Sequence, residues 1–271
     1  MAKKITEQLT GISPEELQHY ECPDCLFPTD NDWEIPTLSL EMQPTMCDIP
    51  FVRFGEQART FPMHGQGTLC FYTDDYKFGD KLYQHPENIL KHNPKNIVEP
   101  NYSLYNETPL AFGLQQIYKK RFIARQMQQK GIRVFVDLNV AQKFYKMNLL
   151  GVPKGYAAFS TRGYSDRLQA LELEYRIAEA NASFAGKKPL FVCYGGGKMC
   201  KDFCSEVGAV YVTPIVSIKN KQKAWEQLKK DGCIAFTDSD YSFRAIEEKQ
   251  QQLALEQVCD YTGQKDILSI N

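Results

Sequence analysis

The sequence contains no hydrophobic run long enough to span a bilayer, and its first residues, MAKKITEQLTG, include no apolar core of signal-peptide length. We therefore expect a cytoplasmic protein with no membrane partner. Neither sign of charge is in excess, because 32 basic residues stand against 33 acidic ones. Any contact with nucleic acid must then come from a local basic patch, since the chain has no overall positive field to supply it.

Several catalytic signatures are also missing. The chain has only four histidines, with no HxH pair, and it has no nucleophile elbow. The segment YGGGKMC lacks the spacing of a nucleotide P-loop, because Lys198 is followed by methionine rather than serine or threonine. It also fails as a dinucleotide-binding fingerprint. These absences argue against a triad hydrolase, a P-loop enzyme and a dinucleotide-dependent dehydrogenase.

No Gly/Ser linker, short repeat or low-complexity tract divides the chain. Residues 1–46 nevertheless differ from the rest, because they contain several prolines, the acidic segment TDNDWE and little periodicity. This composition predicts an irregular N-terminal extension that wraps the main domain. We expect residues 47–271 to form a single α/β domain.

Cysteine is present in an odd number, nine, in a chain large enough to fold without disulfide bonds. Reduced thiols in a cytoplasm explain that number. Cys22 and Cys25 have the two-residue separation of a zinc knuckle, with His19 and Cys47 as further ligands, but no second cysteine pair lies nearby. A structural zinc site and free thiols in a loop are therefore both compatible with this segment.

From residue 47 onward, short apolar runs alternate with helical patterns. Most of the runs are almost continuously apolar, as parallel strands covered on both faces are. They are DIPFVRFGE, TLCFYTDD, NIVEPNYS, IRVFVDLN, YAAFSTRG, LFVCYGGG, AVYVTPIVS and CIAFTDSD. Helices are predicted from Thr108 to about residue 130, from Ser165 onward, and over AWEQLKKDG.

Eight strands with helical connections match a (β/α)8-barrel-like fold, and about 225 residues is near the minimum size for one. An open, doubly wound, mostly parallel sheet explains the same pattern almost as well. We favour the barrel narrowly. In both folds, functional groups gather at the carboxyl ends of the strands.

Acidic residues follow several of these runs, and four of them are candidate catalytic residues. Charged groups are costly inside a strand bundle, so their place just after each run suits the polar mouth of a pocket. Together they would hold Mg²⁺ or Mn²⁺ beside a phosphate group. The four are Asp75, Glu99, Asp137 and Asp238. A single acid at a strand end also has a simpler explanation, because polarity begins where a strand ends.

Two segments are candidate phosphate-binding loops. In STRGY, an arginine fork and two hydroxyl groups match phosphate oxygens, and the glycine allows the backbone to approach. An arginine paired with a neighbouring acid explains STRGY equally well. In YGGGK, a glycine turn leads into a helix N-terminus, which favours an anion. The residues are Ser160, Thr161, Arg162, Gly163, Gly195, Gly196, Gly197 and Lys198.

The helix predicted from Thr108 is rich in basic residues and carries aromatic residues between them. Such a mixture would follow phosphates and stack on bases, so it is a candidate nucleic-acid-binding surface. The alternative is an ordinary solvated helix face. The candidate contact residues are Lys119, Lys120, Arg121 and Arg125.

Several segments together resemble a known family. They are the YTDDYKF region, IVEPNYSLYNETP, IYKKRF, QQKGIRVFVDLNV, AAFSTRGY and the YGGG turn, over roughly residues 45 to 215. In this order they are similar to domain of unknown function family 4417, an uncharacterised family of phages, plasmids and other mobile elements. The resemblance implies a mobile-element protein with DNA or nucleotides as partners. It also implies an acidic residue in many members at the position of Asn101.

Two functions remain open. One is a phage or plasmid enzyme, a metal-dependent phosphoesterase or nuclease, in which the strand-end acids hold the metal while Arg162 and the glycine turn hold phosphate. The other is a non-catalytic accessory protein that binds nucleic acid or a nucleotide in the same pocket. Both predict DNA-binding or nucleotide-binding through phosphate, and only the first predicts turnover.

Overall fold

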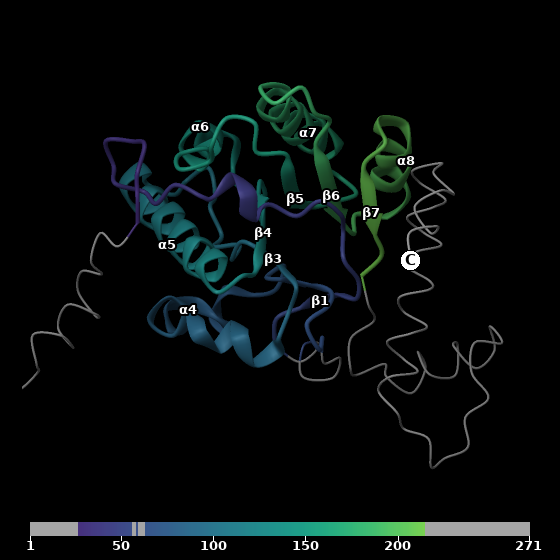
Figure 1. Cartoon of the computed structure of the whole chain (residues 1–271). Helices are drawn as coiled ribbons and strands as arrows, with labels where there is room; N and C mark the ends of the chain where they lie inside the picture. Colours follow the sequence, from purple (N-terminus) through teal and green to yellow (C-terminus); the bar gives the residue numbers. More distant parts are fainter. Residues whose placement is uncertain (1–26, 56–57, 59–62, 215–271) are drawn as a thin grey trace, which may run out of the picture.

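The computed structural model describes residues 27–55, 58 and 63–214. Seven strands alternate with helices in chain order (Figure 1). The strands are β1 (Phe51–Arg53), β2 (Thr68–Cys70), β3 (Asn96–Val98), β4 (Arg133–Asp137), β5 (Ala158–Arg162), β6 (Leu190–Tyr194) and β7 (Val210–Val212). The α-helices are α4 (Gly79–Gln84), α5 (Leu110–Gln129), α6 (Tyr145–Asn148), α7 (Leu168–Ser183) and α8 (Gly197–Val207). Four short 3-10 helices are η1 (Leu40–Met42), η2 (Asp75–Lys77), η3 (Pro86–His92) and η4 (Gln142–Phe144).

All seven strands are parallel, and each pairs with its neighbour in the sequence, in the order β1-β2-β3-β4-β5-β6-β7. The sheet curls into a nearly closed barrel with the helices between its strands, so the predicted α/β barrel-like fold is confirmed (Figure 1). The doubly wound alternative is wrong for these strands, because that topology reverses the strand order at a switch point. Seven of the eight predicted strands are found here. The eighth, CIAFTDSD, lies outside the described residues.

Proline and glycine residues mark the ends of the longest helix, and an apolar repeat marks the buried face of the next. Helix α5 starts directly after Pro109, whose fixed φ is compatible with a helix start, and ends before Gly131 at a φ of +83°. Helix α7 begins at Leu168, three residues later than predicted. Its buried side chains recur at three- and four-residue steps, at Leu171, Glu174, Ala178 and Ala182. This spacing packs one stripe of the helix against the sheet.

The segment before β1 packs along α5 and reaches the end of the barrel at which the strands begin. Ile35 and Leu38 are buried, and the backbone of Ser39 exchanges hydrogen bonds with the Gln128 side chain on α5. The Gln43 side chain accepts from the backbone of Ala157 just before β5, at 2.6 Å. The part around Ser39 and Gln43 therefore covers the amino-terminal end of the strands, whereas Ile35 packs with Leu104 and Val140, which follow β3 and β4.

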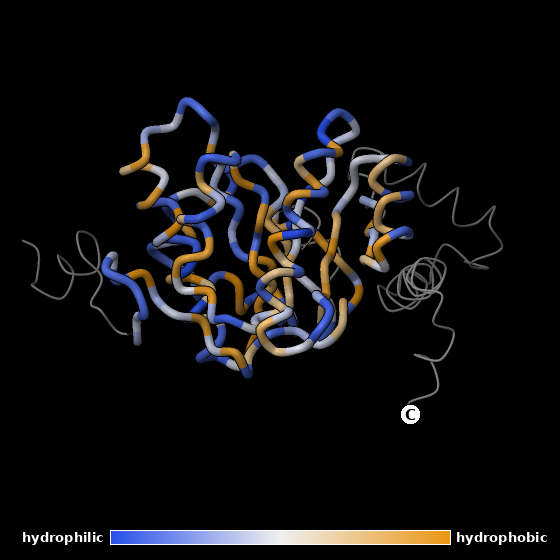
Figure 2. The backbone as a smooth tube through the Cα atoms, turned by 90° about the horizontal axis from the view of Figure 1, so that it is seen from above, coloured by the Kyte–Doolittle hydropathy of each residue, from blue (hydrophilic) through white to orange (hydrophobic). Residues whose placement is uncertain are grey.

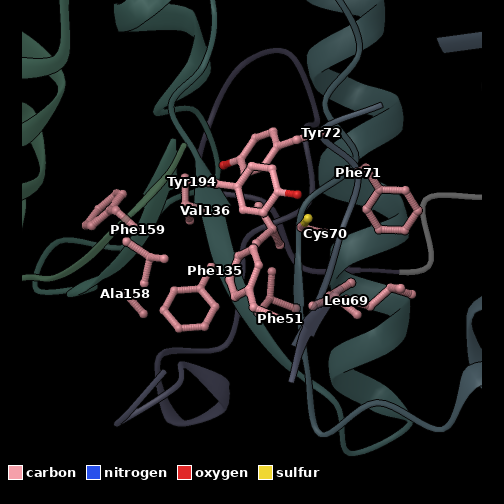
Figure 3. Packing of buried hydrophobic residues seen from close by; sticks show 14 of the residues in the cluster. Phe51, Leu69, Cys70, Phe71, Tyr72, Phe135, Val136, Ala158, Phe159 and Tyr194 are labelled. Carbon is pink, nitrogen blue, oxygen red and sulfur yellow. The ribbon is translucent and has the colours of Figure 1, made fainter. Parts of the chain in front are cut away.

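The interior of the barrel is filled by apolar and aromatic side chains. Seen from above, hydrophobic residues are concentrated along the central strands, and the outer loops are mostly hydrophilic (Figure 2). Phe51 on β1 and Tyr72 after β2 both stack on Tyr194 of β6, with ring centroids 5.6 Å apart in each pair (Figure 3). Contacts between β1, β2 and β6 cross the barrel, so its interior is a packed core rather than a pore. No helix among the described residues has the length and apolar character needed to span a membrane.

Candidate functional site

An open cleft of about 1510 Å³ lies at the carboxyl ends of the central strands. Its walls come from the loops that follow β2, β3, β4 and β5, together with the first turns of α7 and Met199 on α8. In parallel barrels these loops meet at one end of the molecule, because every strand points the same way. The cleft is therefore where sequence-distant side chains converge.

One wall of the cleft is acidic and carries two exposed aromatic rings. Asp74 and Asp75 follow β2, and the Asp75 carboxylate accepts hydrogen bonds from the backbone N–H of Ser103 at 2.9 Å and from its hydroxyl at 3.0 Å. This ties the loop after β2 to the loop after β3. Tyr76 is 84% exposed and Tyr105 is 65% exposed on these same loops. Rings this open offer flat apolar surfaces to a ligand in the cleft.

The opposite wall carries two arginines and an acid, Asp166. The Arg162 guanidinium lies 5.3 Å from the centre of the Tyr164 ring, and the Arg167 guanidinium lies 4.8 Å from the same ring. Both arginines are exposed, and all three residues line the cleft. Stacking on the ring holds a guanidinium in place and leaves its N–H groups free to donate. Among the described residues, neither arginine forms a salt bridge.

Glu174 contributes a buried carboxyl group to the cleft from α7. It is 5% exposed, accepts a hydrogen bond from the Thr161 hydroxyl at 2.6 Å, and contacts the Tyr145 hydroxyl at 3.4 Å. Burial raises its pKa to about 8, more than the Thr161 hydrogen bond lowers it, and the charge of Asp137 adds to the increase. Glu174 is therefore a carboxylic acid that keeps its proton near neutral pH and can donate it or take it back.

Beneath the cleft lies a buried network of two acids and two bases. Arg121 and Glu99 form an ion pair in which neither side chain is exposed. The Lys120 ammonium lies 3.5 Å from an Asp137 carboxylate oxygen, 3.8 Å from Glu99, and 2.9 Å from the Asp137 backbone oxygen. The two negative charges are thus matched by two positive ones, as buried charges require. Burial lowers the pKa of Lys120, and the two carboxylates oppose that decrease.

Asp137 also connects this network to the barrel interior. Its carboxylate accepts hydrogen bonds from the Tyr72 hydroxyl at 3.2 Å and from the Asn101 amide at 2.8 Å. The Tyr72 hydroxyl in turn contacts the Ser160 hydroxyl at 2.9 Å. Side chains on or just after four neighbouring strands, β2 to β5, therefore hold one another in fixed positions below the cleft.

The family model described as "Domain of unknown function (DUF4417)" matches residues 27–207. The chain belongs to this family. It is also 23% identical over 233 residues to the "Gene 1 protein" of Mycobacterium phage D29, an alignment that covers 81% of this chain and 78% of that protein. No solved structure gives a significant match. The predicted resemblance is confirmed, and the chain is a phage-associated protein.

In this DUF4417 domain, Asp75 lies apart from Glu99 and Asp137, which are neighbours around Lys120. Asp75 lies in the acidic wall and bonds to Ser103, whereas Glu99 and Asp137 are buried beneath the cleft and paired with Arg121 and Lys120. Within the described part of the chain, no group of three or more His, Cys, Asp or Glu residues is arranged to hold a metal ion. Asp238, Cys22 and Cys25 lie outside the described residues.

The two candidate phosphate loops pack against each other. A side chain at Gly163 would overlap the carbonyl oxygen of Gly195, and one at Gly196 would lie 2.9 Å from the Gly163 Cα atom. Gly195, Gly196 and Gly197 all have positive φ, which glycine adopts without strain. Of the two cations, only Arg162 lines the cleft, while Lys198 lies exposed on the first turn of α8 outside it. The glycines thus allow close packing of the loops, and Arg162 and Lys198 do not line one site.

The predicted basic face of α5 is wrong for two of its four residues. Lys120 and Arg121 point into the molecule, where they are 2% and 0% exposed. Lys119 binds Asp80 at 2.7 Å, and the Arg125 guanidinium lies over the Phe27 ring at 5.5 Å. The reason is the helical repeat, because Lys120 and Arg121 share a face with the buried residues Ile117 and Ala124. This helix is therefore an internal support of the site.

Sequence reasoning missed Glu174, although a signal for it exists. It lies three residues after Leu171 and four before Ala178, on the apolar stripe of α7. An acid on a buried helix face needs partners, and Thr161 and Tyr145 supply them. The same reasoning applies to Lys120 and Arg121 on α5. Charged residues on the buried faces of α5 and α7 therefore indicated the site better than acidic residues after the strands did.

Proposed function

We propose that this phage-associated domain binds single-stranded nucleic acid in the cleft at the carboxyl ends of β2 to β5. The observation that supports it is that one wall of the cleft carries arginines and the other carries exposed aromatic rings. Arg162 and Arg167 stack on Tyr164 on one side, and the exposed rings of Tyr76 and Tyr105 stand on the other. Proteins that bind single strands combine cations that follow phosphates with rings that stack on bases.

The size and charge of the cleft favour a strand over a small metabolite. Pockets for small molecules usually measure about 300–1000 Å³ and enclose the ligand, whereas this cleft is larger and open. Asp75 and Glu107 make the other wall acidic and repel a phosphate backbone, so the backbone runs along the arginine wall and the bases face the tyrosines. A mononucleotide would use the same chemistry with fewer contacts.

A second candidate is an enzyme that acts on the same ligand, and Glu174 is the observation that favours it. A carboxylic acid with a pKa of about 8 at the wall of a cleft is suited to transferring a proton at neutral pH. The neighbouring carboxylates do not form a metal site, because Asp74 pairs with Lys77 at 3.1 Å and both oxygens of Asp75 accept hydrogen bonds from Ser103. Without turnover, the same residues would serve binding alone.

The test is fluorescence anisotropy with a 3′-labelled 12-residue DNA or RNA strand, a matching duplex and competing mononucleotides. We expect the single strand to bind best, and Arg162→Met to weaken binding by on the order of tenfold. Loss of one phosphate contact should also reduce, by about one, the slope of the logarithm of the binding constant against the logarithm of the salt concentration. Tyr105→Ala should weaken binding by about 5- to 100-fold, the range for one base stack.

The control is Lys188→Met, which removes an exposed positive charge just before β6, at the end of the barrel opposite the cleft. It should leave the affinity within about twofold, as a distant surface charge does. Binding that the two cleft variants and this control weaken equally would contradict a specific cleft. Absence of binding to every strand and nucleotide at low salt would overturn the proposal. Product formed with Mg²⁺ or Mn²⁺, and lost in Glu174→Gln, would establish the enzyme.

A further inference from the structure

Polar side chains also gather at the mouth of the barrel, next to the cleft. In a strand, alternate residues point to the same face. Phe51 on β1 packs on Tyr194 in the interior, so Arg53, two residues later, has the same inward direction. Ser160 on β5 contacts Tyr72 in the interior. Arg162, two residues later and the last residue of β5, therefore has its side chain on the same, inward face of the strand. Two arginine side chains from separate strands therefore lie at the carboxyl-terminal mouth of the barrel.

Tyr194 lies between these arginines and has an unused hydroxyl group. It is the last residue of β6, stands in register with Arg162 on β5, and is 3% exposed. Its hydroxyl oxygen is buried and has no hydrogen-bond partner among the described residues. An unpaired buried hydroxyl costs about 1–3 kcal/mol, so such groups are rare and mark places where a partner is expected.

The direction of this hydroxyl follows from its stack with Tyr72. The two rings lie with centroids 5.6 Å apart, and their oxygens stand at opposite ends of the pair (Figure 3). The Tyr72 oxygen meets Ser160 and Asp137, while the Tyr194 oxygen faces the side of Cys70. Cys70 is in register with Arg53, so the Tyr194 hydroxyl points toward the β1 side of the mouth.

The electrostatics agree with this geometry. Burial raises the pKa of Tyr194 and raises that of Cys70 to about 12, while the positive charges of Arg53 and Arg162 oppose the increase at both groups. Asp137 also acts on Cys70, but Lys120, Asn101 and Tyr72 already bind its carboxylate. The mouth between Arg53 and Arg162 is therefore positive and contains a hydroxyl donor.

We infer that Arg53, Arg162 and Tyr194 form an anion-binding subsite that takes a terminal phosphate group. Two guanidinium groups and one hydroxyl can donate hydrogen bonds to the oxygens of a phosphate monoester. A monoester has three unsubstituted oxygens, whereas a phosphodiester within a strand has two. Arg162 also lines the cleft, so the subsite opens onto it. The subsite rests on the proposed function, because the cleft determines that the whole ligand is a single strand. It adds that a strand with a terminal phosphate binds better than one without.

Two measurements test the subsite separately from the cleft. First, inorganic phosphate is titrated against the whole protein and followed by ³¹P line broadening and thermal unfolding. We expect saturable binding that Tyr194→Phe weakens on the order of tenfold and Arg53→Met weakens more, since it removes a charged donor. Lys188→Met should bind phosphate as the natural protein does. Tyr194→Phe removes an unpaired group, so it folds with unchanged or higher stability and remains informative if Arg53→Met does not fold.

Second, a 3′-labelled strand with a 5′-phosphate is compared with the same strand ending in a 5′-hydroxyl. The natural protein should prefer the phosphorylated strand by on the order of tenfold, and Tyr194→Phe should remove most of that preference while retaining affinity for the hydroxyl strand. Equal binding of both strands, with no saturable phosphate binding, would overturn the subsite and leave the cleft intact. Phosphate binding without any strand binding would overturn the proposed function and retain the subsite.

Discussion

Glu99 and Arg121 form an ion pair with no exposed surface on either side chain, directly beneath the cleft. The remaining N–H groups of Arg121 donate to the backbone oxygens of Asn148 at 2.6 Å and Leu150 at 3.1 Å. One guanidinium group therefore holds together helix α5, the end of β3, and the last residue of α6 with the segment that follows it. The loops that form the cleft rest on this buried group.

Breaking this pair should destabilise the whole domain. Arg121→Met removes the guanidinium from the buried Glu99 carboxylate and leaves it the Lys120 ammonium 3.8 Å away, so we expect the free energy of unfolding to fall by about 3–5 kcal/mol. Urea unfolding followed by circular dichroism measures the change. Asp80→Asn is the control, because it removes the partly exposed pair between Lys119 on α5 and Asp80 on α4 and should cost at most about 1 kcal/mol. Equal losses in both variants would contradict the account of α5 as an internal support.

Glu174 predicts an unusual dependence of stability on pH. Its folded pKa is about 8, against an ordinary value of 4.5, so the folded chain holds a proton that the unfolded chain releases between these values. The contribution of Glu174 to stability therefore decreases as the pH rises from about 4.5 to 8, by on the order of 3–5 kcal/mol, and levels off above that. Glu174→Gln keeps a neutral, hydrogen-bonding side chain and should remove this decrease.

The measurement is the free energy of unfolding at several pH values between 4.5 and 9 for the natural protein and the variant. Glu179→Gln, at an exposed position on the same helix, is the matched control and should follow the natural protein. If the difference between the natural protein and Glu174→Gln stays constant across this range, Glu174 does not hold a proton in the folded state. The same titration would then remove the main support for proton transfer in the cleft.

The glycines of STRGY and YGGGK yield a prediction about packing. Gly163→Ala places a methyl group against the Gly195 carbonyl oxygen and 2.9 Å from the Cys193 sulfur, so the two loops must separate. We expect a loss of about 1–3 kcal/mol in unfolding free energy, as overpacking usually costs. Gly186→Ala is the control, because it has a positive φ but nothing within 4 Å. Its cost should be about 1 kcal/mol from backbone strain alone.

Much of the fold could be predicted from the sequence because parallel strands buried on both faces are apolar throughout. The runs at β1 to β7 are short, but they stand out between polar loops, and their spacing leaves room for helices. The site was harder to predict, because strand-end polarity does not distinguish an exposed acid from a buried one. Glu99 and Asp137 follow strands as Asp75 does, yet they pair with cations from α5 that only the three-dimensional packing places beside them.

The segment YGGGK gives the sharpest comparison between sequence and structure. The turn leads into α8 as predicted, but the cation that lines the cleft is Arg162, not Lys198. We expect Lys198→Met to leave the affinity for a single strand within about twofold, and Arg162→Met to lower it by on the order of tenfold. Anisotropy titrations at one fixed salt concentration compare the two. A loss in Lys198→Met as large as that in Arg162→Met would show that the strand extends over the start of α8, and the cleft would then have to include the glycine turn.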